Sequence, residues 1–201
     1  KTGTITEGKP RVTDIITVKD VQEMELLRIT ASAERGSEHP LGEAIVRDAE
    51  ERGLTFSTIE KFDAITGHGI EVKVDGINVL AGNKKLMHDR NISLEDLIGD
   101  SDALASQGKT PMYIAFNHKI AGIIAVADTV KQNSVEPIDR LHKMGIEVAM
   151  LTGDNKATAN AIAKQVGIDR VLSEVLPEDK ADEVKKLQAE GKKVAMVGDG
   201  I

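Results

Sequence analysis

The chain has 201 residues, of which 40% are hydrophobic, and a formal net charge of −7. This length is enough for one large domain or two modest ones with buried cores, and we expect two. The acidic balance argues against a nucleic-acid surface, so a polyanionic ligand would depend on local lysines or on a metal ion such as Mg²⁺.

Membrane and cysteine chemistry are also limited by the composition. No stretch approaches the roughly 20 uninterrupted apolar residues that span a bilayer, and no signal-like segment opens the chain, so we expect a soluble piece. The absence of cysteine excludes disulfides, thiolate catalysis and Cys-based metal sites within these residues. Aromatic residues make up only 2% of the chain, so the cores must be aliphatic.

The first half of the chain combines helical and β patterns. Helices are expected over 21–33, 41–51, 84–88 and 93–106. Short β runs are expected from 56 to 81, among them strands over 70–74 and 77–81, and further strands are expected over 112–116 and 120–126. The Asp75-Gly76 pair is a hairpin-turn signal between the first two of these strands. Together these patterns predict an α+β unit with an antiparallel sheet.

After Asp128, helices and strands alternate, which is typical of a parallel α/β sheet. Helices are expected over 134–144, 156–166 and 180–189, and strands over 147–151, 170–172 and 193–197. Two of the apolar runs end directly in Thr152-Gly153-Asp154 and in Gly198-Asp199. Both motifs are therefore expected at the carboxyl ends of strands, where open α/β sheets bind ligands.

The change of pattern along the chain indicates that one domain is inserted into another. If Lys1-Thr2-Gly3-Thr4 follows a strand further upstream, residues 11–126 form an α+β domain within an α/β domain made of 1–10 and 127–201. No linker rich in serine or proline separates the two parts. We expect the α/β domain to be incomplete at both ends of the chain.

The acidic and small residues of three segments suit a phosphoryl group. Phosphoryl transfer to a carboxylate needs an acidic nucleophile, Mg²⁺ and donors to the phosphate oxygens. Thr152 and the Gly153 amide are candidate donors, and Asp154 follows them. The structural alternative for Asp154 is an N-cap of the helix over 156–166.

Two further residues complete this candidate phosphate site. Asp199 lies between glycines that let the backbone turn sharply, so its carboxylate can reach Mg²⁺. Lys180 would begin a helix and could bring a positive charge to the phosphate. A solvated surface lysine is the alternative for Lys180.

The segment around His39 is a candidate purine site. A neutral imidazole can stack on or hydrogen-bond a purine, while the preceding Glu38 accepts from an exocyclic amine. The other histidines are expected to be surface or structural residues: His68, His88, His118 and His142. The Gly67-His68-Gly69 segment can let a backbone loop approach a nucleotide, and an ordinary turn before Ile70 is the alternative.

Six motifs follow one another in a familiar order. They are Lys-Thr-Gly-Thr at 1–4, Ser-Glu-His-Pro at 37–40, Gly-His-Gly at 67–69, Thr-Gly-Asp-Asn at 152–155, Leu-Pro-Glu-Asp-Lys at 176–180 and Gly-Asp-Gly-Ile at 198–201. In order and spacing they resemble the haloacid-dehalogenase-like catalytic head of P-type ATPases. Ser-Glu-His-Pro-Leu resembles the adenine-binding motif of the heavy-metal subfamily, and the segments 126–131 and 161–168 look most like copper exporters.

This resemblance implies a fold and a set of roles. The fold is a parallel-sheet phosphorylation domain with an inserted antiparallel-sheet, nucleotide-binding α+β domain. Lys1 and Thr2 would follow a phosphorylated Asp that the chain lacks, and Asp128 resembles a hinge-side Asp. The remaining implied roles are phosphate binding by Thr152, Gly153, Asp154 and Lys180, Mg²⁺ binding by Asp199, and ATP binding by Glu38, His39, Gly67, Gly69 and Gly82.

The implied function is the ATP-binding and phosphorylation head of a heavy-metal pump, with Cu⁺ the favoured cargo and Zn²⁺, Cd²⁺ and Ag⁺ still open. The resemblance implies transmembrane, actuator and metal-binding domains in the same intact chain, with this piece as a cytoplasmic domain. A haloacid-dehalogenase-like phosphatase with a cap domain is the enzymatic alternative. Thr2 argues against it, because such phosphatases carry a general-acid Asp at that position. In isolation the chain is expected to be an inactive nucleotide-binding module.

Overall fold

The structure is a computed structural model that describes residues 1–198, and these residues divide into two compact units. Unit 1 contains Lys1–Lys9, Ala105–Gly108 and the chain from Asp128 onward, whereas unit 2 contains Pro10–Leu104 and Lys109–Ala127. In the described part of the chain, every helix is too short or too polar to cross a membrane.

Unit 2 is built on a six-stranded antiparallel sheet with the strand order β1-β6-β5-β4-β3-β2. The strands are β1 (Arg11–Thr17), β2 (Ile59–Ile65), β3 (Gly69–Val74), β4 (Ile77–Gly82), β5 (Thr110–Phe116) and β6 (Lys119–Ala127). The predicted hairpin joins β3 to β4, and Asp75 and Gly76 both have positive φ, as such a turn requires. Strand β1 was not predicted; it pairs along β6 at one edge of the sheet.

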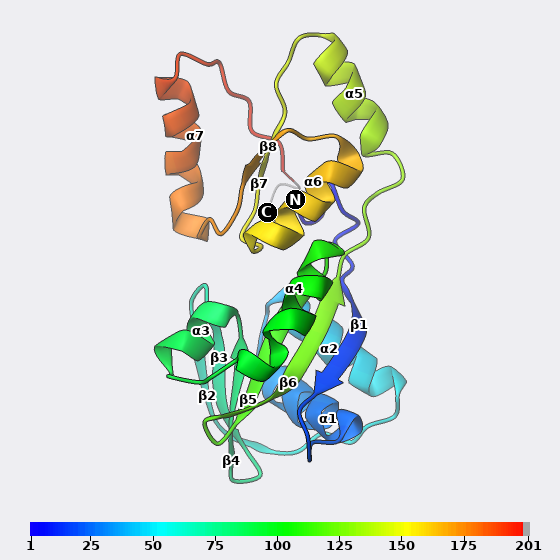
Figure 1. Cartoon of the computed structure of the whole chain (residues 1–201), viewed down its shortest axis with the longest axis vertical. Coiled ribbons are helices and arrows are strands. Elements are labelled where there is room, and N and C mark those ends of the chain that lie inside the picture. The colour runs from blue at the N-terminus through cyan, green and yellow to red at the C-terminus, as the bar shows by residue number, and fades with distance from the viewer. Residues whose placement is uncertain (199–201) are drawn as a thin grey trace. The chain divides into compact units, whose positions relative to one another are not determined.

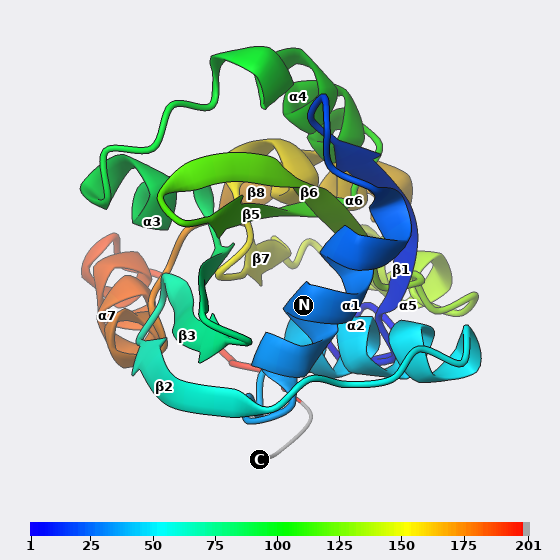
Figure 2. The ribbon, with the colours of Figure 1, turned by 90° about the horizontal axis from the view of Figure 1, so that it is seen from below.

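Helices cover both faces of this sheet (Figure 2). The helices of unit 2 are α1 (Glu23–Glu34), α2 (Pro40–Glu51), α3 (Lys84–Asp89) and α4 (Ile98–Ser106), with a short 3₁₀ turn η1 (Glu95–Leu97) before α4. Helices α1 and α2 pack on one face, around Leu27 and Ile114, and α3 and α4 on the other, around Leu86 and Ile123. Successive residues of a strand point to opposite faces, so the sheet supplies both cores.

Unit 1 has a smaller core around two parallel strands, β7 (Ala149–Leu151) and β8 (Arg170–Leu172) (Figure 1). Its helices are α5 (Val135–Lys143), α6 (Lys156–Val166) and α7 (Lys180–Ala189), with a 3₁₀ turn η2 (Pro177–Asp179) leading into α7. The core is formed around Ile138, Met150 and Ile162. This β-α-β order matches the predicted alternation.

The strand predicted over 193–197 is not formed. These residues have no strand or helix assignment, and Met196 and Val197 are 63% and 78% exposed. A strand needs a neighbour to receive its backbone hydrogen bonds, and within residues 1–198 the sheet of unit 1 pairs β7 with β8 alone. The prediction of a strand was therefore wrong, because this apolar run pairs with no strand among the described residues.

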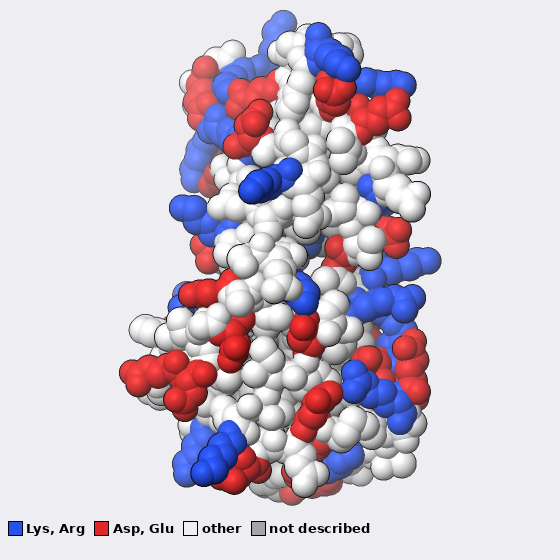
Figure 3. Space-filling view, turned by 45° about the vertical axis from the view of Figure 1, so that its right-hand side comes forward, with Lys and Arg blue, Asp and Glu red and all other residues white. Residues whose placement is uncertain are grey.

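Charged side chains of both signs are interleaved on the face drawn in Figure 3. Many form surface ion pairs, such as Arg140 with Glu136 at 2.6 Å and Arg170 with Glu190 at 2.8 Å. Exposed pairs of this kind contribute little to stability. The three hydrophobic cores, two in unit 2 and one in unit 1, therefore carry most of the folding free energy.

Candidate functional site

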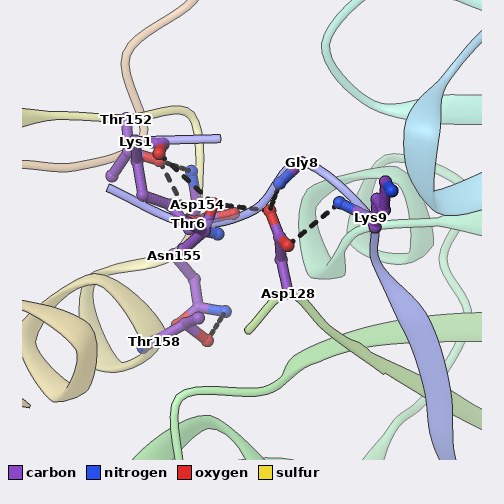
Figure 4. Close-up of polar contacts among 9 residues, drawn as sticks. All are labelled: Lys1, Thr6, Gly8, Lys9, Asp128, Thr152, Asp154, Asn155 and Thr158. Atoms are coloured by element: carbon purple, nitrogen blue, oxygen red, sulfur yellow. Dashed lines mark hydrogen bonds and ion pairs between the residues drawn. The ribbon is translucent and has the colours of Figure 1, made fainter. Parts of the chain in front are cut away.

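The loop after β7 brings together three residues of the predicted phosphate site (Figure 4). The ammonium of Lys1 lies 2.8 Å from Oδ2 of Asp154, and the Thr152 hydroxyl donates to the same oxygen at 3.0 Å. Thr152 Oγ1 also accepts from the Asp154 amide at 3.1 Å. The side chains of Lys1 and Asp154 are only 7% and 16% exposed, so this ion pair is shielded from solvent.

Backbone hydrogen bonds fix this loop in place. The Thr152 amide donates to the Leu172 carbonyl at 2.9 Å, and the Val175 amide donates to the Thr152 carbonyl at 3.1 Å. The Glu174 amide donates to the Asp154 carbonyl at 2.9 Å. The segment after β8 therefore braces the segment after β7, as expected where the carboxyl ends of adjacent parallel strands meet.

The N-cap of α6 is Asn155 rather than Asp154. The Asn155 side chain accepts from the Thr158 amide at 2.9 Å, which satisfies an amide at the helix start. The alternative reading of Asp154 as the cap is therefore wrong, and its carboxylate instead pairs with Lys1. Gly153 is exposed, and an added Cβ would make only an ordinary contact with the Val175 carbonyl, 3.5 Å away. Local packing thus gives no reason for glycine at position 153.

The other predicted phosphate residues are not joined to this group. Lys180 is the first residue of α7, and among the described residues its ammonium forms no hydrogen bond or ion pair. Thr2 is exposed. Asp199, the predicted Mg²⁺ ligand, lies outside the described residues, and within residues 1–198 no three His, Asp or Glu side chains are grouped to hold a metal ion.

Asp128 fastens the segment that leads from Lys1 to unit 2 (Figure 4). Its carboxylate accepts from the buried Thr6 hydroxyl and from the amides of Gly8 and Lys9, both at 3.2 Å. Hydrogen bonds to a carboxylate are among the stronger ones in proteins. The start of the chain is therefore held against the residue at which unit 1 resumes.

In unit 2, His39 caps helix α2. Its Nδ1 accepts from the Leu41 amide at 3.2 Å, so Nε2 carries the proton of the neutral ring. His39 and the preceding Glu38 are both exposed. The cap fixes the orientation of the ring at the start of α2, beside the predicted purine site.

Sequence reasoning missed Glu34, at the end of α1. This carboxyl is only 3% exposed, and burial raises its pKa from 4.5 to about 7, while a hydrogen bond from the Ser37 side chain lowers it. Ser37 Oγ in turn accepts from the His39 amide at 3.2 Å. An added Cβ on Gly42 would lie 2.3 Å from a Glu34 oxygen.

The signal for Glu34 was present but ambiguous in the sequence. A glycine inside a helix costs about 1 kcal/mol, so Gly42 in α2 calls for a packing reason. That reason is the Glu34 carboxylate, which occupies the space of the missing side chain. A buried carboxyl with a raised pKa beside a loop is a typical functional-site feature.

The predicted glycines lie together where β2, β3 and β4 meet. Gly67 and Gly69 have φ of 71° and 146°, and Gly69 pairs with Gly82 across the sheet. A Cβ on Gly69 would lie 2.1 Å from the Ala81 carbonyl oxygen, and one on Gly82 would lie 2.2 Å from the His68 carbonyl oxygen. Gly69 and Gly82 are therefore required by the backbone packing itself, whatever else they contact.

The whole chain, residues 1–201, matches a family model described as haloacid dehalogenase-like hydrolase. Copper-exporting P-type ATPases of Staphylococcus aureus strains JH9 and MRSA252 are each 56% identical to the chain over 202 residues. Those residues cover all of this chain but 25% of each relative, so the chain spans about a quarter of their length.

Solved structures give the same assignment. A zinc-transporting PIB-type ATPase in an E2.Pi state is 39% identical and matches with a TM-score of 0.65, covering 100% of this chain and 32% of that one. The catalytic domain of the CPx-ATPase CopB-B is 25% identical, with a TM-score of 0.76 and coverage of 99% and 68%. The chain belongs to the haloacid dehalogenase-like hydrolases and, within them, resembles the heavy-metal P-type ATPases.

Proposed function

We propose that this chain is the ATP-binding and phosphorylation head of a heavy-metal-transporting P-type ATPase that exports Cu⁺. Unit 1 is the phosphorylation domain and unit 2 is the inserted nucleotide-binding domain. The observation that carries the proposal is the meeting of Lys1 and Asp154 beside Thr152, at the carboxyl end of β7. Residues distant in sequence thus form one charged, shielded group where an α/β sheet binds its ligands.

In unit 1 each of these residues has a distinct task. When phosphate binds, the Thr152 hydroxyl turns from Asp154 and donates, with the Gly153 amide, to phosphoryl oxygens, and Gly153 allows close approach because it has no side chain. Lys1 supplies positive charge, and Asp154 holds its ammonium in position. Lys180 adds a second positive charge at the start of α7, and Mg²⁺ bound with the help of Asp199 neutralises the incoming phosphate.

In unit 2 the adenine is held beside the start of α2. The neutral His39 ring stacks on the purine, and either Glu38 or the buried Glu34 accepts from its exocyclic amine. Support comes from the Nδ1 cap of His39 and from the Ser37 link to Glu34, which fix the loop before any ligand arrives. Gly67, Gly69 and Gly82 line the same site.

In the intact protein, phosphorylation of an Asp preceding Lys1 would couple ATP hydrolysis to metal transport. The transmembrane, actuator and metal-binding domains of the same chain would be its partners, with this head on the cytoplasmic side. The resemblance to copper exporters in sequence supports Cu⁺ as the cargo.

Calorimetric titration of ATP into the chain tests the nucleotide site. The informative variant is His39→Asn, because asparagine is a good N-cap and preserves the start of α2 while removing the ring. Stacking of a base on a ring is worth about 1–3 kcal/mol, so ATP affinity should fall roughly five- to a hundredfold. Omission of Mg²⁺ should leave wild-type binding intact, because this contact involves the base.

The matched control is His118→Asn, in the β5–β6 turn at a residue with φ of 63°, which asparagine tolerates. This variant should bind ATP like the wild type. An ATP affinity that His39→Asn does not change would reject the stacking of adenine on His39. No ATP binding at all would reject the nucleotide-binding assignment and favour a phosphatase with a cap domain.

A further inference from the structure

Residues Thr66–Gly69 connect β2 to β3, and we call this segment the glycine turn. The carbonyl groups of Thr66, Gly67 and His68 each accept a hydrogen bond from within the protein. The Asn83 side chain donates to the Gly67 carbonyl at 2.8 Å, and the Asn83 amide donates to the His68 carbonyl at 2.9 Å. The Thr66 carbonyl accepts from the His68 ring at 2.7 Å. Each of these three carbonyl oxygens therefore has a protein donor.

Both ring nitrogens of His68 face specific groups. Nδ1 carries a proton, because its partner is the Thr66 carbonyl. Nε2 lies 3.8 Å from Oδ2 of Asp89, at the end of α3. Lys85 and His88 also approach the Asp89 carboxylate, at 2.8 and 3.6 Å. The His68 side chain is only 21% exposed, so the ring is held rather than free in solvent.

The Asn83 side chain performs two tasks in the same place. Its oxygen accepts from the Leu86 amide and caps α3, while its nitrogen donates to the Gly67 carbonyl. Helix α3 thus reaches the glycine turn at both of its ends, through Asn83 at the start and Asp89 at the finish. The turn is fixed before a ligand binds, which reduces the entropy cost of binding.

We propose that His68 is a positioning residue for the phosphate chain of the bound nucleotide. Its Nδ1 proton holds the Thr66 carbonyl on the ring, so that this oxygen is directed to a protein donor rather than toward phosphate oxygens. On the other side of the ring, Nε2 lies 3.8 Å from the Asp89 carboxylate, which is too far for a hydrogen bond. The inference rests on the proposed nucleotide site and adds a specific role for a histidine that was expected to be a surface or structural residue.

Two near-isosteric substitutions separate the two contacts of the ring. In His68→Asn the amide nitrogen can take the place of Nδ1 and still donate to the Thr66 carbonyl. In His68→Gln the amide reaches instead toward the position of Nε2, and His68→Ala removes both. The dissociation constants of ATP and of adenosine are measured by NMR titration of the full chain, with His118→Asn as the control.

We expect His68→Ala and His68→Gln to weaken ATP roughly fivefold, the effect of one hydrogen bond, while His68→Asn stays within about twofold of the wild type. Adenosine should bind all variants alike, because it has no phosphate. Equal losses for ATP and adenosine, or a His68→Asn variant as weak as His68→Ala, would overturn the role of His68. Failure of the proposed function itself would appear differently, as wild-type protein that binds neither ligand.

Discussion

The two units differ in how completely they bury their apolar residues. Unit 2 has a six-stranded sheet with helices on both faces and two hydrophobic clusters. Unit 1 has two paired strands and one smaller cluster, and the apolar side chains of Met144, Met196 and Val197 are largely exposed. The same kind of apolar run is covered in one unit and uncovered in the other.

This difference shows that strands in a βαβ arrangement and strands in an antiparallel sheet find their partners in different ways. Most neighbouring strands of unit 2 are also consecutive in sequence, and short turns join β2 to β3, β3 to β4 and β5 to β6. The parallel strands of unit 1 need partners brought in by crossovers, and in residues 1–198 the run 193–197 has none. Local sequence therefore specified unit 2 more completely than unit 1.

The largest expected effect comes from the cores themselves. Ile29 in α1 and Ile162 in α6 are buried helical isoleucines of the two units, 1% and 4% exposed. Truncation to alanine should cost about 4 kcal/mol at Ile29 and about 2 kcal/mol at Ile162, because the smaller core can relax around the cavity. The two losses are measured separately by hydrogen exchange of backbone amides in increasing urea. Amides of β5 report on unit 2 and amides of α6 report on unit 1. Equal losses would mean that the two cores are packed equally well.

The next largest effect is a pH dependence of stability. We expect it in unit 2, because the carboxyl group with the strongly raised pKa, Glu34, lies there. The folded pKa is about 7 and the ordinary value is 4.5, so folded protein binds the proton more tightly than unfolded protein between these values. The contribution of Glu34 to the stability of unit 2 is fully present below about pH 4.5. It is lost as pH rises toward 7, by at most about 3 kcal/mol.

Urea midpoints of unit 2 between pH 5 and 7.5 measure this slope. In Glu34→Gln the side chain stays neutral at every pH, so the fall in stability over this range should largely disappear. The exposed Glu38 is the matched site, and Glu38→Gln should keep the wild-type slope. A slope that survives in Glu34→Gln would assign the pH dependence to another group.

The smallest expected effect is the loss of stability when one glycine in each unit, Gly69 or Gly153, is replaced by alanine. Gly69→Ala should destabilise unit 2 by about 1–3 kcal/mol, because the new Cβ meets a backbone carbonyl and φ is 146°. Gly153→Ala should change the stability of unit 1 by less than about 0.5 kcal/mol, because its Cβ makes an ordinary contact. Thermal melts of both variants measure this contrast. A large loss at Gly153 would show that packing, rather than ligand approach, requires that glycine.

Much of the fold was predictable because local signals were strong. The predicted helix over 156–166 matches α6 in full, although its N-cap is Asn155 rather than Asp154. The helix over 93–106 begins instead as the turn η1, and β1 was missed because polar residues interrupt its apolar pattern. The run 193–197 failed for a different reason, because strand formation depends on a partner that no local pattern reveals.

The candidate site was predictable in its residue types but not in its contacts. The motifs located Thr152 and Asp154, yet the pairing of Asp154 with Lys1 follows from the path of the chain between them. Likewise, the sequence indicated Glu38 as the acidic partner of His39, whereas the buried carboxyl is Glu34. Burial is a property of the folded core, so a single sequence could not rank two nearby glutamates.

The pairing of β1 with β6 has a consequence for how unit 2 can be handled. Arg11 lies opposite Ala127, so the chain enters and leaves this unit at neighbouring points. An insert whose ends adjoin needs only a short gap in its host, and it can be cut out or moved without a stretched linker. Residues 10–127 should therefore be a portable module, which a different host loop could accept.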